Sequence, residues 1–186
     1  GSVEDGIHRV HSKKPVDIVY IGTTGASGLK EVLLGSNAER VIRESLLPVM
    51  AIPSNCSYAP IKRVVLATDL KANHSKDVFN PLLKLLKDDR ALLNIIHVHS
   101  GEDPVGRDLL AEREKLEQIF SSHLDSFEFI NTSDIPQGIN DFIENKTVDV
   151  LAMVPRKVNF FQRLFKQSIS KDMAYHTKVP LLTLKD

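Results

Sequence analysis

The sequence is poor in the features that would place it in several large functional classes. It has one cysteine, Cys56, so neither an internal disulfide nor a cysteine metal cluster can form, which fits a reducing compartment and makes the cytoplasm the expected location. Lys plus Arg and Asp plus Glu both number 24, so no net field draws the chain to nucleic acid or an anionic membrane. Its apolar runs fall far short of the roughly 20 residues that cross a bilayer, and no signal peptide is expected.

Sequence motifs of catalysis are also missing. The chain has no Walker-type Gly-Lys-Ser/Thr, and no serine, histidine and aspartate trio has a recognisable local pattern, so the sequence gives little support for an enzyme. With 186 residues and 42% hydrophobic composition, it is long enough for one α/β domain, or for one domain with part of another.

A repeat with a single offset of 132 residues links the two ends of the chain. Residues 2–53 align with residues 134–185 without a gap. The identical pairs are Gly6/Gly138, Ile7/Ile139, Lys14/Lys146, Val16/Val148, Asp17/Asp149, Ser36/Ser168 and Pro48/Pro180. We expect each copy to fold as helix, buried strand, loop, helix and buried strand. The expected strands cover 16–22 and 48–52 in the first copy and 148–154 and 180–184 in the second, and the helices between them cover 29–45 and 161–176.

More chain precedes the second copy than the first. It predicts strands over 63–70, 91–98 and 125–131, and helices over about 75–88 and 105–122 that begin at Ser75 and Asp103. Residues 61–186, termed the C-terminal segment, therefore hold a complete doubly wound α/β domain with a parallel sheet. Residues 1–53, termed the N-terminal segment, hold only the last two strands of such a domain, and 54–60 form a linker. Because about 50 residues bury too little surface to fold alone, upstream chain, the C-terminal segment or a second molecule must complete them.

The pattern with the most chemical meaning is Gly-x2-Gly-x9-Gly-Ser at the end of the first predicted strand. It comprises Gly22, Thr23, Gly25, Gly35 and Ser36. Glycines at a strand-to-helix junction permit positive φ and close backbone approach, so that amide N–H groups converge on phosphate oxygens. The alternative is a set of turn and packing glycines, because an isolated glycine pattern is weakly specific.

The block IGTTGASGLKEVLLGSNAERVIRESLLPVMAIP (21–53) resembles the C-terminal signature of the universal stress protein family, in its ATP-binding branch. The opening IKRVVLATDL (61–70) is also similar to that family. The resemblance implies a flavodoxin-like, adenine nucleotide alpha hydrolase-like sheet, ordered 3-2-1-4-5, that pairs two domains through their last strands. Residues 1–53 would then be the C-terminal half of a first repeat, and 61–186 a complete second repeat. The glycine residues and Ser36 would contact the triphosphate and ribose of ATP.

The second repeat departs from this loop pattern. Val154-Pro155 replaces Gly22-Thr23, and Gln167 replaces Gly35. Proline has no N–H to offer a phosphate, and glutamine at positive φ would cost roughly 1–2 kcal/mol. We therefore expect the second repeat not to bind nucleotide.

The resemblance also divides the site between the two repeats. In the family, the early strands of the same domain hold the base and ribose, with an acidic residue after the first strand. The C-terminal segment has such an acid, Asp69, at a sheet edge where these folds bind ligands, with loop capping as the alternative. The N-terminal segment has the glycine loop but not those strands. Each repeat thus holds a different half of the site, and we expect ATP to bind this chain weakly.

Several other side chains have two interpretations each. His97 and His99 lie two apart on a strand, so they share a side and form either a metal site, for which no third ligand is evident, or a solvated pair. Phe160, Phe161, Leu164 and Phe165 either pack in the core or fill the phosphate cavity, and nearby Arg156, Lys157, Arg163, Lys166 and Lys171 form a solvated face or bind an anion. Cys56 is expected to be exposed. The run 101–118 is expected to form an amphipathic helix with Glu112 on its surface.

Pairing of the last strands would leave the first strand of the N-terminal segment as an open apolar edge. Such an edge is prone to association, so we predict a homo-oligomer through the last strands and this edge. The leading interpretation is a stress-response regulatory module that binds adenine nucleotide, without nucleic acid or membrane as partner. The alternatives are a weak ATPase in the full-length protein and a protein-interaction scaffold without a ligand.

Overall fold

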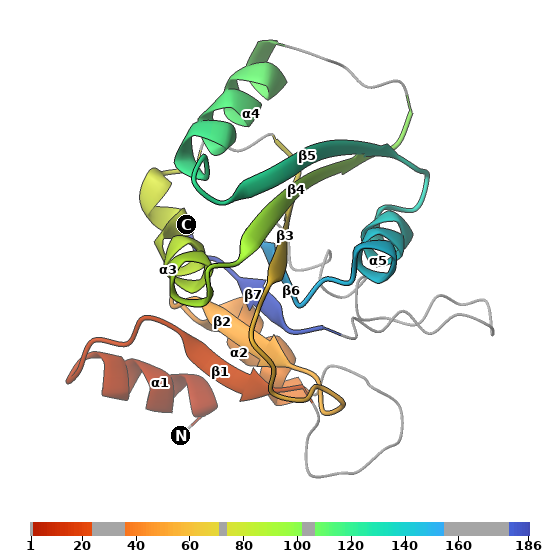
Figure 1. Ribbon diagram of the computed structural model, residues 1–186. Helices are drawn as coiled ribbons and strands as arrows, with labels where there is room; N and C mark the ends of the chain where they lie inside the picture. The colour runs from red at the N-terminus through yellow and green to blue at the C-terminus, as the bar shows by residue number, and fades with distance from the viewer. Residues whose placement is uncertain (1, 24–35, 71–73, 102–106, 155–178) are drawn as a thin grey trace.

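One β-sheet runs through the part of the chain that the computed structural model describes, residues 2–23, 36–70, 74–101, 107–154 and 179–186 (Figure 1). Within these residues the strand order is β1-β2-β7-β6-β3-β4-β5. The strands are β1 (Val19–Gly22), β2 (Val49–Ile52), β3 (Arg63–Thr68), β4 (Leu92–His99), β5 (Leu124–Asn131), β6 (Val150–Met153) and β7 (Leu181–Thr183). The helices are α1 (Val3–His11), α2 (Ser36–Glu44), α3 (Asn80–Asp89) with the preceding 3-10 turn η1 (Lys76–Phe79), α4 (Arg107–Ile119) and α5 (Ile135–Lys146).

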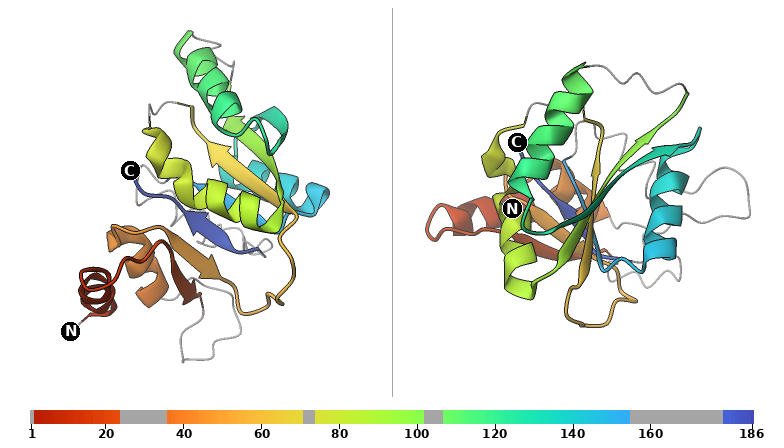
Figure 2. Two further views of the ribbon diagram at one scale, coloured as in Figure 1. Left: turned by 60° about the vertical axis from the view of Figure 1, so that its left-hand side comes forward. Right: turned by 45° about the horizontal axis from the view of Figure 1, so that its top comes forward.

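The C-terminal segment forms the predicted doubly wound sheet. Its strands lie in the order β5-β4-β3-β6-β7, which in chain order is 3-2-1-4-5, and all neighbours within it are parallel. The predicted strand order is therefore confirmed. Parallel neighbours need crossover connections, and α3 and α4 lie on one face of the sheet while α5 lies on the other (Figure 2).

The N-terminal segment extends the same sheet. β2 pairs antiparallel with β7, and β1 pairs parallel with β2. Thr183 Oγ1 donates a hydrogen bond of 3.2 Å to Val49 O, and Lys185 Nζ donates one of 2.6 Å to Ile42 O. Burial lowers the pKa of Lys185. As predicted, the two last strands pair with each other and β1 is left at the edge of the sheet.

Hydrophobic layers on both faces hold the helices to the sheet. On the face of α3 and α4, the rings of Phe79 and Phe120 meet edge-on with centroids 5.5 Å apart. On the other face, Ile139 of α5 belongs to the same buried cluster as Val41 and Ile42 of α2. Because both faces are covered, the central strands are continuous apolar runs. Among the helices of the described residues, none has the length and apolar composition that a membrane crossing needs.

The start of the helical region after β3 agrees with the sequence. Ser75 Oγ accepts a hydrogen bond of 3.3 Å from Asp77 N–H and caps η1, as predicted. Asp103, the other predicted helix start, lies outside the described residues.

The predicted exposure of Glu112 on α4 is wrong. Its side chain is buried, with 8% of the residue exposed. Lys115 Nζ lies 3.4 Å from Glu112 Oε2 and donates a hydrogen bond of 2.6 Å to His74 O. The turn that carries His74 therefore packs close to this face of α4, a contact between distant residues that helical periodicity does not reveal.

Candidate functional site

The predicted phosphate loop begins where β1 ends. Gly22 is the last residue of β1, and Thr23 N–H donates a hydrogen bond of 3.0 Å to Ile52 O. Only 3% of Thr23 is exposed, and its Oγ1 has no hydrogen-bond partner in the described part of the chain. A buried hydroxyl without a partner costs about 1–3 kcal/mol, so Thr23 is a donor that a ligand oxygen could satisfy.

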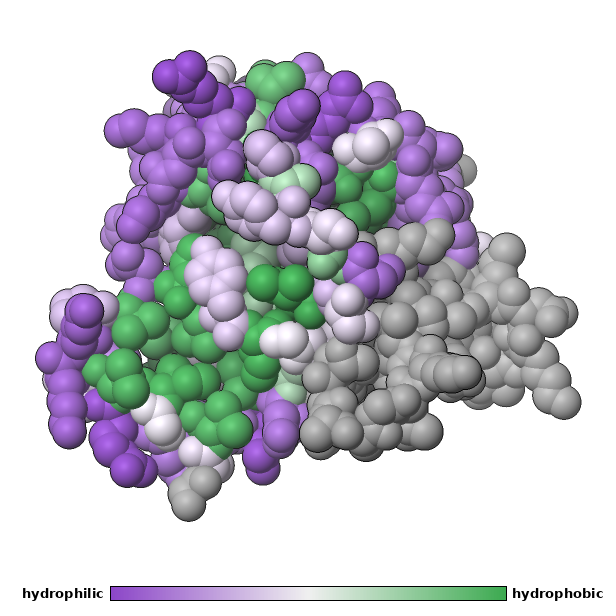
Figure 3. Space-filling model, turned by 60° about the horizontal axis from the view of Figure 1, so that its bottom comes forward, coloured by the Kyte–Doolittle hydropathy of each residue, from purple (hydrophilic) through white to green (hydrophobic). Residues whose placement is uncertain are grey.

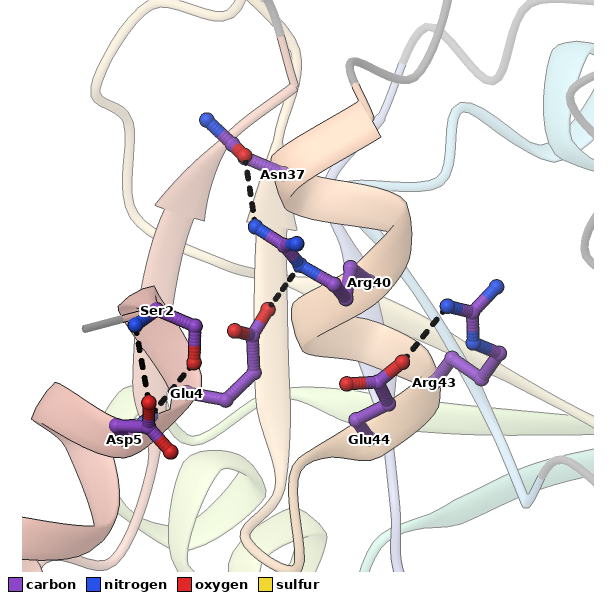
Figure 4. Close-up of polar contacts among 7 residues, drawn as sticks. All are labelled: Ser2, Glu4, Asp5, Asn37, Arg40, Arg43 and Glu44. Atoms are coloured by element: carbon purple, nitrogen blue, oxygen red, sulfur yellow. Dashed lines mark hydrogen bonds and ion pairs between the residues drawn. The ribbon is translucent and has the colours of Figure 1, made fainter.

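The far end of the predicted loop is the first turn of α2. Ser36 is the first residue of α2, while Gly25 and Gly35 lie outside the described residues. Because β1 and β2 are parallel, α2 runs back between them, and its N-terminus lies at the same sheet edge as the end of β1. Figure 4 shows Asn37, in the first turn of α2, beside that edge. The positive end of the α2 dipole favours an anion there.

An ion pair joins α1 to α2 beside this edge (Figure 4). Glu4 is 5% exposed, its Oε1 accepts a hydrogen bond of 2.8 Å from Arg40 Nε, and Arg40 Nη2 donates one of 3.3 Å to Asn37 Oδ1. A hydrogen bond from its own backbone N–H lowers the pKa of Glu4 most, followed by bonds from Ser2 and Arg40, and together they outweigh burial. Sequence reasoning missed this pair because an acid in a first helical turn looks like ordinary dipole compensation.

Asp69 lies at the opposite edge of the sheet from this loop. It follows β3 directly and is exposed. β3 is parallel to β6 and β7, whereas β7 is antiparallel to β2, so β1 and β3 end at opposite edges. The structure therefore does not bring Asp69 together with Gly22 and Thr23 within one chain.

The predicted histidine pair lies at the end of β4. His97 Nδ1 is 2.9 Å from Thr68 O, and the rings of His97 and His99 stack with centroids 5.7 Å apart, which confirms that they share one side. The Phe129 ring meets His97 edge-on at 5.8 Å, and Arg113 lies over Phe129 at 5.6 Å. Within the residues described, no three His, Cys, Asp or Glu side chains are placed to hold a metal ion.

The loop that was predicted to be the second-repeat counterpart of this site lies almost entirely outside the described residues. This applies to Pro155 and Gln167, and to the aromatic and basic side chains between 156 and 171. Val154 follows β6 and is half-buried. The predicted loss of phosphate binding by this loop stays a prediction.

A hollow of about 620 Å³ lies between the N-terminal segment, the linker and α3. Its lining is mostly apolar and includes Tyr20, Met50, Ile52, Cys56, Tyr58 and Leu85. Figure 3 shows hydrophobic side chains gathered on the side of the molecule that carries β1, β2 and the linker. Cys56 is half-buried in this wall, so the prediction that it is exposed is wrong, and burial raises the pKa of its thiol.

Residues 1–53 match the sequence profile of the universal stress protein family. The universal stress protein MJ0531 of Methanocaldococcus jannaschii is 50% identical over 40 residues, 22% of this chain and 24% of that protein. The universal stress protein MJ0577 of the same organism is 38% identical over 52 residues, 28% of this chain and 32% of that protein. The N-terminal segment thus matches this family over its whole length.

The rest of the chain shares the fold of universal stress proteins. A crystal structure of one from Archaeoglobus fulgidus superposes with a TM-score of 0.66 at 20% identity, covering 96% of this chain and 66% of that one. The chain spans about a quarter to a third of the curated universal stress proteins it matches. The sequence match to the family contains every residue of the predicted phosphate loop and ends before Asp69.

Proposed function

We propose that this chain is a stress-response regulatory module whose N-terminal segment carries a phosphate loop for adenine nucleotide, and whose C-terminal segment is a degenerate repeat that serves as its scaffold. The positions of the elements support a tandem repeat. α5 begins 132 residues after α1, at Ile135 and Val3, and β7 begins 132 residues after β2, at Leu181 and Val49. These offsets equal the single register that aligns the two ends of the sequence.

The observation that carries the proposal is the burial of the Thr23 hydroxyl. It is buried without a partner at the end of β1, next to Gly22, inside the family match. A phosphate oxygen would accept its hydrogen bond and lie at the positive end of the α2 dipole. An ordinary packing glycine turn gives no reason to bury an unsatisfied hydroxyl.

Two features of the sheet support weak rather than tight nucleotide binding by this chain. Among the described strands, β1 has no neighbour on its outer side, and Asp69 lies at the end of the strands opposite to the one where β1 ends. Micromolar affinity needs about 8 kcal/mol, whereas a few charge-assisted hydrogen bonds of about 1.5–3 kcal/mol each are offset by the cost of association. We expect a dissociation constant for ATP weaker than about 10 μM.

Calorimetric titration with MgATP and with inorganic tripolyphosphate tests this proposal. The matched variant is Thr23→Val, which keeps the shape of the side chain and removes the hydroxyl. We expect weak binding of both ligands to the wild type, weaker binding to Thr23→Val, and no loss of thermal stability in the free variant. A dissociation constant below about 10 μM would contradict the divided site. Equal binding by the variant would show that Thr23 is not part of the phosphate-binding site. No binding by either protein would favour an interaction scaffold without a ligand.

The predicted homo-oligomer and the cytoplasmic location stay predictions. The last strands, β2 and β7, each have a neighbour on both sides within the sheet. They are therefore not available to a second molecule, and β1 is the part of the predicted interface that is open.

A further inference from the structure

One face of α1 forms an exposed apolar stripe. Val3 is 44% exposed and Val10 is 56% exposed, with Gly6 between them on the same face. A shallow hollow of about 540 Å³ lies here, lined by Ser2, Gly6, Arg9, Val10, Lys13 and Lys14. A helix with a stripe of this kind normally buries it against a sheet.

The equivalent stripe of α5 does have a sheet beneath it. A Cβ atom on Gly138 would lie 2.7 Å from Thr132 Cγ2, 3.0 Å from Val98 Cγ1 and 3.6 Å from Ile130 Cγ2. Gly138 therefore lets α5 approach β4 and β5 closely. Its repeat partner is Gly6, where a Cβ atom would meet nothing within 4 Å. α1 keeps the glycine of a close helix-to-sheet contact, but no described strand lies against its Gly6 face.

The edge of the sheet beside α1 is open in the same way. Val19 N–H donates to Pro48 O at 2.9 Å and Thr23 N–H to Ile52 O at 3.0 Å. Because successive residues of a strand alternate in direction, the N–H groups of Tyr20 and Gly22 point away from β2. β6, the repeat partner of β1, uses this side to pair in parallel with β3.

The third open position is the face of β1 toward the larger hollow. Tyr20 lines that hollow and is 62% exposed. Its repeat partner Ala152 is fully buried, in the same cluster as Leu82 and Leu86 of α3. In the C-terminal segment all three equivalent places are filled. β3 pairs at the edge of β6, β4 and β5 lie against the stripe of α5, and α3 covers the equivalent face of β6.

We propose that the open edge of β1, the α1 stripe and the Tyr20 face together form one docking site for a parallel strand-helix-strand unit. The occupant is a polypeptide segment that residues 1–186 do not contain, and its first strand is apolar on both faces and pairs in parallel with β1. Side chains of its following strands pack against Gly6, as Val98 and Thr132 pack against Gly138. The proposal does not depend on nucleotide binding.

A second molecule of the chain is a poorer occupant. Its own β3 is already paired with β6, and β4 with β3, so among the described strands it offers only the edges of β1 and β5. The helices that follow these strands, α2 and α5, already pack against the molecule's own sheet, so neither edge presents a free strand-helix-strand unit, which the three open positions require together. Backbone pairing supplies affinity in such strand addition, and the pockets on the two faces supply specificity.

The test uses an extended chain in which residues 61–133 are placed ahead of Ser2 of the full chain. This insertion reproduces the 132-residue register. Amide hydrogen exchange of Tyr20 and Gly22 reports on the β1 edge, and we expect it to slow by about tenfold or more in the extended chain. In the original chain we expect fast exchange that does not depend on protein concentration.

Gly6→Ala supplies a second readout, with Gly138→Ala as its control. In the original chain Gly6→Ala should raise Tm by about 2–4 °C, because alanine favours the helix and meets no neighbour. In the extended chain it should lower Tm, as Gly138→Ala does in both chains.

Three outcomes would overturn the proposal. The first is unchanged exchange at β1 in the extended chain, including the case in which the added residues fail to order. The second is a rise in Tm from Gly6→Ala in both chains. The third is protection of β1 in the original chain that grows with concentration, which would mean that a second molecule covers the edge.

Discussion

Gly138→Ala is expected to destabilise the protein although it adds a good helix former. The gain in helix propensity is about 1 kcal/mol. The new Cβ would lie only 2.7 Å from Thr132 Cγ2 and 3.0 Å from Val98 Cγ1. Both neighbours are β-branched and have few alternative rotamers, so they yield poorly, and overpacking of this kind costs about 1–3 kcal/mol. With two such contacts we expect a net loss of about 1–2 kcal/mol.

Thermal and urea unfolding followed by circular dichroism measure this effect. For a chain of this length, each kcal/mol moves Tm by about 2–4 °C, so Gly138→Ala should lower Tm by about 2–8 °C. The urea midpoint should fall while the slope of the transition stays constant, because the surface exposed on unfolding does not change. A Tm equal to or above that of the wild type would refute the close contact between α5 and the two strands.

Other substitutions test individual hydrogen bonds, ion pairs and buried groups. Asp149 Oδ2 accepts hydrogen bonds of 2.7 and 2.9 Å from the N–H groups of Lys62 and Arg63, so Asp149→Ala should cost about 2 kcal/mol in urea titration. Within the described residues, Asp17, which aligns with Asp149 at the 132-residue offset, makes one exposed ion pair, so Asp17→Ala should change stability by less than about 0.5 kcal/mol, and equal losses would contradict this difference. The lowered pKa of Glu4 means that its stabilisation is complete above the ordinary value of 4.5 and is lost as pH falls below it. Glu4→Gln should therefore lower Tm more at pH 7 than below pH 4.5, with the effect shrinking as pH falls, and an equal effect at all pH values would exclude a role for the charge. Because burial raises the pKa of Cys56, its thiol should react with an aromatic disulfide more slowly than N-acetylcysteine at pH 7, with the gap narrowing as pH rises, and a faster reaction at pH 7 would refute the burial.

The strands and helices were predictable because the 132-residue register and the apolar periodicity are patterns that local sequence carries. The 3-2-1-4-5 strand order and the edge position of β1 followed from the family resemblance. The pairing of β2 with β7 followed from the family resemblance. Helical periodicity failed at Glu112, because it does not show that the turn of His74, about 40 positions away, packs close to this part of α4 through Lys115.

The candidate site was predictable only in part. The sequence singled out Gly22 and Thr23 and gave their place at the end of a strand, but not that the Thr23 hydroxyl is buried without a partner. Nor did it pair Glu4 with Arg40, because neither residue lies in a distinctive pattern. Linker composition suggested an exposed Cys56, yet the linker runs along an apolar hollow and half-buries it.

By itself, the sequence determined the repeat, the succession of helices and strands and the position of the glycine loop, because hydrophobic periodicity and glycine spacing are local properties of the chain. Tertiary structure alone decided how these parts face one another. The antiparallel contact of β2 with β7 sends the ends of β1 and β3 to opposite edges, which separates Thr23 from Asp69. Likewise, Gly6 and Gly138 align at the 132-residue offset, and only packing reveals that Gly138 lies against a sheet whereas Gly6 lies on an open face.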